Sequence, residues 1–133
     1  MRYHTMLALT ALFHVSAVGA SATDACYASF NAEGSKASGT TYRVSTFVNS
    51  VDPTTAEKRL ATALLAKGWA NPQINSEFGA MTANVSGHPL NVLVSGVGAG
   101  VKIDAVQRIK PDTDAQEKWF QSAMCEVLAS VGG

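Results

Sequence analysis

Cys26 and Cys125 are the two cysteines of the chain and its clearest candidates for covalent chemistry. In an oxidising compartment, two cysteines without further partners most simply pair with each other. The loop would span about 100 residues, for which the chain-entropy model gives up to roughly 4–5 kcal/mol of stability. Two alternatives stay open: two free thiols, or a lipid-bearing Cys26. The preceding Thr23-Asp24-Ala25 is a poor lipidation signal, and lipidation would leave Cys125 without a partner.

His88 is the only histidine after residue 22. A metal site usually takes three or four protein ligands, so the sequence predicts no metal site. His88 stands in Ser-Gly-His-Pro, which predicts a solvated turn residue. No Gly-x-Ser-x-Gly motif is present. We therefore predict no catalytic residues and no cofactor, while a hydrolase site assembled from a serine, His88 and scattered carboxylates such as Asp104 and Glu77 stays as an alternative.

The glycine-rich segment 96–102, Gly-Val-Gly-Ala-Gly-Val-Lys, has the composition of a phosphate-binding loop but a different pattern. A P-loop needs Gly-Lys-Ser/Thr at its end and a helix after it. Here Val101 separates Gly100 from Lys102, and alternating apolar residues flank the segment on both sides. The pattern favours a hairpin connection in which glycines adopt positive φ.

Residues 1–22 have the layout of a secretory signal peptide. A short basic start precedes an apolar run from Met6 to Val18, and Ala20-Ser21-Ala22 supplies the small residues of a cleavage site between Ala22 and Thr23. The alternative is a membrane anchor, but a run of roughly 13 residues is shorter than the roughly 20 that span a bilayer. We expect an exported protein, periplasmic or extracellular, with no transmembrane segment after cleavage.

The charge balance of the predicted mature chain is nearly neutral. Because Arg2 lies in the leader, the mature chain would contain nine of the ten Lys and Arg residues and all ten Asp and Glu residues. Binding to nucleic acid favours a clear basic excess, so we expect no nucleic-acid partner.

Hydrophobic periodicity predicts one domain over residues 41–133, preceded by an N-terminal arm and flexible connector over 23–40. Alternation predicts strands at 42–48, 78–85, 90–95 and 101–109. Capping patterns predict one helix from Pro53 to about Gly68 and a second after Thr113. The expected fold is α+β with the order β-α-β-β-β-α: a mainly antiparallel four-stranded sheet with two helices packed on one face.

Two aromatic residues have no obvious place in the predicted core. Phe47 lies on the strand side opposite Tyr42 and Val44, and Trp119 is next to the core residue Phe120 on a helix. We interpret Phe47 and Trp119 as a possible partner surface. The function expected is a small exported non-catalytic module that binds a protein or envelope component through a sheet face or edge. A small-molecule or lipid carrier with an apolar cavity is the main alternative.

Overall fold

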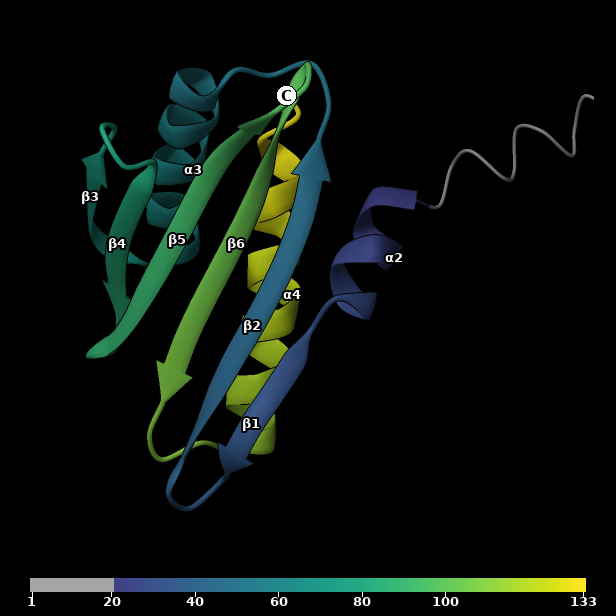
Figure 1. The fold of residues 1–133 in the computed structure, drawn as a ribbon. Helices are drawn as coiled ribbons and strands as arrows, with labels where there is room; N and C mark the ends of the chain where they lie inside the picture. Colours follow the sequence, from purple (N-terminus) through teal and green to yellow (C-terminus); the bar gives the residue numbers. More distant parts are fainter. Residues whose placement is uncertain (1–20) are drawn as a thin grey trace, which may run out of the picture.

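A computed structural model describes residues 21–133, which form an α+β fold built on a six-stranded antiparallel sheet (Figure 1). The strands lie in the order β1-β2-β6-β5-β4-β3. Their bounds are β1 Asn31–Ser35, β2 Gly39–Val48, β3 Ala70–Asn75, β4 Ala80–Val85, β5 His88–Val97 and β6 Gly100–Ile109. The helices of this part of the chain are α2 Ser21–Ala28, α3 Pro53–Lys67 and α4 Asp114–Ser130. The predicted α+β class is confirmed.

Helices α3 and α4 cover one face of the sheet, and the core lies between the two layers (Figure 1). Side chains of the central strands alternate accordingly: Val92 and Ile103 are buried, whereas Leu93 and Lys102 are exposed. An antiparallel sheet that packs on helices with one face and is open to solvent on the other gives this period-two alternation of buried and exposed side chains. Among the described residues no element covers the second face.

Helix α3 begins and ends where its sequence signals place it. The Asp52 side chain accepts a hydrogen bond from the Thr55 N–H at 2.7 Å, and Pro53 occupies the first helical position. At the other end Gly68 adopts φ 105°, the left-handed conformation that glycine tolerates best. The Trp69 N–H then donates to the Leu64 carbonyl, which turns the buried indole back onto the core.

The expected count of four strands is wrong, because two edge strands were not predicted. Residues 31–40, assigned above to a flexible connector, form β1 and the start of β2. Residues 70–75 form β3, although Asn71-Pro72 suggested a break. Both edge strands carry mostly exposed side chains, so neither has the apolar alternation by which strands are recognised. Pro72 is accommodated because β3 lies at the edge and its register shifts between Ala70 and Gln73.

The predicted disulfide is confirmed: Cys26 of α2 is bonded to Cys125 of α4, 99 residues further along the chain. Both cysteines are buried. The bond joins α2 to α4. Helix α2 lies on the side of the molecule where β1 and β2 form one end of the sheet (Figure 1). Helix α2 therefore packs beside α4 and does not cover the second face of the sheet.

The predicted signal peptide lies outside the described residues, except for Ser21 and Ala22, which with Thr23 stand at the start of α2. Among the helices of residues 21–133, none combines the length and the apolar character needed to cross a bilayer.

Leu60→Ala should lower the free energy of unfolding by about 3 kcal/mol. Leu60 lies on the buried face of α3, where it is 1% exposed, and truncation of its side chain leaves a cavity. Leu65→Ala is the matched control, since Leu65 lies on the same helix and is 56% exposed. Urea denaturation measures both. Equal losses in the two variants would contradict the placement of the α3 core face.

Thiol titration of the denatured, non-reduced protein should find essentially no free thiol, because both cysteines are consumed by the bond. The Cys26→Ser, Cys125→Ser double variant should be less stable by roughly 2–5 kcal/mol. Two titratable thiols per chain would contradict the pairing.

Candidate functional site

Strand β2 is paired on one side along its whole length and on the other side along only part of it. It pairs with β6 from Thr40 to Val48, whereas its pairing with β1 stops at Arg43. Within residues 21–133, no strand pairs with the β1 side of β2 beyond Arg43. The second half of β2 therefore has no neighbouring strand on the side where β1 pairs with its first half.

The backbone groups on this edge can be assigned from one hydrogen bond. The Ser45 N–H donates to Ser29 Oγ at 3.2 Å, so the backbone of Ser45 points away from β6. Polar backbone groups alternate sides along a strand, so the N–H and C=O of Phe47 point the same way. The Ser45 N–H is already taken by Ser29, so the groups of β2 that are open to a further strand are the Ser45 carbonyl and the N–H and C=O of Phe47. Unpaired edge groups of this kind are the template on which a further strand adds.

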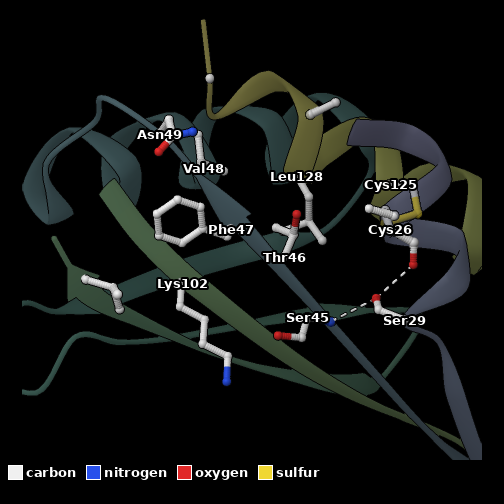
Figure 2. A pocket seen from close by; sticks show the side chains of 14 residues that line it. Cys26, Ser29, Ser45, Thr46, Phe47, Val48, Asn49, Lys102, Cys125 and Leu128 are labelled. Carbon is white, nitrogen blue, oxygen red and sulfur yellow. Dashed lines mark hydrogen bonds between the residues drawn. A yellow bond between two sulfur atoms is a disulfide. The ribbon is translucent and has the colours of Figure 1, made fainter. Parts of the chain in front are cut away.

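An open groove of about 850 Å³ runs beside this edge; we call it the β2 groove (Figure 2). One wall is the stretch from Ser45 to Asn49, and the opposite wall is Ala25, Cys26 and Ser29 of the α2 segment. The remaining lining residues come from β5, β6, α4 and the residues that follow α4, namely Val97, Lys102, Cys125, Leu128, Ala129 and Gly132. The lining is mostly apolar, and Lys102 carries its only charged side chain.

The two sides of the β2 groove differ in character, as Figure 2 shows. Phe47 and Lys102 lie together on the open face of the sheet, where they are opposite each other in the β2–β6 register. Leu128 and the disulfide lie toward the helix layer. An extended chain lying along β2 would direct alternate side chains to these two sides.

A separate cluster of charged groups joins the β1–β2 turn to the start of α4. Lys36 Nζ lies 2.7 Å from a carboxylate oxygen of Glu117 and 3.5 Å from one of Asp112. The Tyr42 hydroxyl donates to Asp112, whose side chain is fully buried. The Asp112 N–H donates to the Lys36 carbonyl at 2.8 Å, so backbone and side-chain bonds reinforce each other.

The pKa values of this cluster favour its charged, bonded form. Burial on its own would raise the pKa of Asp112, but hydrogen bonds from Tyr42, Thr40 and the Thr113 N–H, with the charge of Lys36, hold it below its usual range. Burial and the bond to Asp112 raise the pKa of Tyr42. The bond to Glu117 raises the pKa of Lys36. With every group engaged by a partner, the arrangement is that of a structural fastening.

A third feature is a smaller recess of about 280 Å³ between the β4–β5 turn and α4, which we call the Trp119 recess. It is lined by Val85, Ser86, His88, Ile109, Ala115, Gln116 and Trp119. The turn itself is Ser86-Gly87, both with positive φ as a tight hairpin requires. His88 is therefore the first residue of β5 and half-buried, not a solvated turn residue as expected.

The sequence-predicted residues thus fall at four separate places. Phe47 and the cysteines line the β2 groove, His88 and Trp119 line the Trp119 recess, and Asp104 lies 3.9 Å from Lys102 on the open sheet face. Glu77 is exposed in the β3–β4 turn. Within the described residues, no group of three or more potential ligands gathers to hold a metal ion.

Sequence reasoning missed Ser29, Gln107 and the Lys36 cluster. Ser29 and Lys36 act through contacts with residues distant in the chain, which leave no local pattern. Gln107 interrupts the apolar alternation of β6, and an uncharged polar residue at a core position is the one signal that could have marked a buried hydrogen bond.

The chain matches no protein-family model, no curated protein and no solved structure.

Asp112→Asn should change how stability depends on pH. A carboxyl whose folded pKa is depressed contributes stability above its unfolded pKa, and loses it as pH falls through the folded value. The free energy of unfolding should thus decline in the wild type below about pH 4, near the unfolded pKa of aspartate. Asp112→Asn should lack part of this decline, whereas Asp114→Asn should keep it, because the Asp114 side chain is 92% exposed. Urea denaturation between pH 7 and pH 3 measures the effect, and identical profiles for wild type and Asp112→Asn would contradict it.

Proposed function

We propose that the protein is a non-catalytic exported module that binds an extended segment of another protein along the open edge of β2. The observation that carries this proposal is the end of β1–β2 pairing at Arg43 beside the β2 groove. The occupant is a peptide backbone, because a backbone offers an acceptor and a donor at the spacing of the outward N–H and C=O of Phe47.

The site favours a particular kind of segment. From Ser45 to the end of β2 at Val48 the edge is about 10 Å long at about 3.3 Å per residue, and Ser29 already occupies the Ser45 N–H, so a short strand suffices. The mostly apolar lining favours apolar side chains at alternate positions, directed toward Leu128 and the disulfide. Lys102, as the one charged lining residue, favours an acidic side chain on the open-face side.

The bound strand would extend the sheet where β1 ends. Over its first half β2 already pairs with β1, so the added strand would occupy the equivalent position further along. The β2 strand is held by β6 throughout, and the groove wall is fixed by the disulfide. Binding to a site that is already ordered costs less conformational entropy than binding to a mobile one.

The two alternatives from the sequence find less support. A lipid carrier favours an enclosed apolar cavity, whereas the β2 groove is open to solvent along β2. A hydrolase would need a base and its partners in one place, and the lining of the Trp119 recess joins His88 to Ser86 without a carboxylate.

Phe47→Pro tests strand addition, because proline removes the outward N–H while leaving the bonds of β2 to β6 in place. Phe47→Ala is the matched control that removes the same aromatic ring but keeps the N–H. Peptides selected from a random library on the disulfide-bonded protein should bind Phe47→Pro at least about tenfold more weakly than Phe47→Ala, the order of one lost backbone hydrogen bond.

In the same experiment, hydrogen exchange at the Phe47 amide of the wild type should slow when peptide binds. Thr46→Pro should instead impair folding, because Thr46 pairs with Ile103 of β6. Equal peptide affinities for Phe47→Pro and Phe47→Ala, with unchanged exchange at Phe47, would overturn the proposal.

A further inference from the structure

The Trp119 recess shares no lining residue with the β2 groove and lies against different elements. Its exposed aromatic wall is held in place from behind. The ring of Trp119 stacks on that of Trp69 at a centroid distance of 5.0 Å and an interplanar angle of 32°. Trp119 is nevertheless 41% exposed, so part of the residue stays open to a ligand.

Trp69 is itself fixed by a buried chain of hydrogen bonds. Its Nε1–H donates to Gln107 Oε1 at 3.0 Å, and Gln107 Nε2 donates to the Pro89 carbonyl at 2.9 Å. Trp69 and Gln107 are almost wholly buried. The orientation of Trp119 is therefore supported by the core, and a ligand would meet an aromatic surface that needs little ordering on binding.

The polar groups of the recess carry no formal acid or strong base. The Ser86 hydroxyl, the His88 imidazole and the Gln116 amide supply donors and acceptors. Gln116 is steadied by the Thr113 hydroxyl, which donates to its Oε1 at 3.3 Å. No Asp, Glu, Lys or Arg is among the lining residues, so the site has no permanently charged side chain to select a carboxylate, a phosphate or an ammonium ion.

We propose that the Trp119 recess binds one ring of a neutral saccharide. A volume of about 280 Å³ lies just below the range of drug-sized ligand pockets, about 300–1,000 Å³, and suits a single ring. A sugar ring presents C–H groups on one face and hydroxyls around its rim. The electron-rich face of an indole attracts the C–H face, and the neutral donors and acceptors match the hydroxyls. Cages for quaternary ammonium ions use several aromatic walls, whereas this recess has one.

The test is saturation-transfer NMR followed by calorimetry on the disulfide-bonded protein with glucose, galactose, mannose, N-acetylglucosamine and their short oligosaccharides. At least one should bind, with a Kd no weaker than about 1 mM. Trp119→Ala should weaken that binding at least about tenfold, and Gln116→Ala about two- to tenfold, the range for one lost hydrogen bond. Trp119→Phe should retain most of the affinity, because an aromatic wall remains.

Phe47→Ala is the control, since Phe47 lies at the β2 groove and its loss should leave saccharide affinity unchanged. The absence of binding by every saccharide, or binding that survives Trp119→Ala, would overturn the proposal. So would Trp119-dependent binding of planar heteroaromatic compounds without saccharides. None of these results bears on peptide binding at β2, which Phe47→Pro addresses separately.

Discussion

The bond between Cys26 and Cys125 is the constraint on which the shape of the β2 edge depends. It ties α2 to α4 in the helix layer, so the chain must cross from that layer to the sheet between Cys26 and Asn31. Pairing of β1 with β2 therefore begins at Asn31 and Arg43 and cannot run further along β2. Ser29 lies at the crossing and bonds to both sides of the gap, accepting from the Ser45 N–H and donating to the Cys26 carbonyl.

The other end of the β1–β2 hairpin, its turn, is bound to the start of α4 and to the residue Asp112 before it by an ion pair and a hydrogen bond. Lys36 lies in its turn and bonds to Glu117 at the start of α4, while Tyr42 of β2 bonds to the buried Asp112. The hairpin is thus held to α4 at the cysteine end and at the turn end. Strand β2 lies between these fastenings and is paired with β6 along its length, which makes its free edge an ordered surface.

Sequence reasoning predicted the strands that bury one face and the helices that begin or end at a capping residue. The Asp52 and Gly68 caps, the alternation of β5 and β6 and the cysteine pairing all have local or compositional signals. Strands β1 and β3 were not predicted, because exposed edge strands lack an apolar pattern. The β2 groove could not be predicted either, because it arises from where pairing stops, a property of the assembled sheet. Phe47 and Trp119 were recognised as exposed aromatics, but sequence could not assign them to two different recesses.

The central claim is that a partner adds to β2 as a strand, and it can be tested by the geometry of the bound peptide. Residues of β2 whose N–H and C=O groups point toward β6 direct their α-protons to the other side of β2, where an antiparallel peptide strand would lie. Isotope-filtered NMR of the protein with a selected peptide should therefore show short contacts between the α-protons of Thr46 and Val48 and those of the peptide backbone. Contacts confined to side chains of the open sheet face, with none to the β2 backbone, would contradict the account.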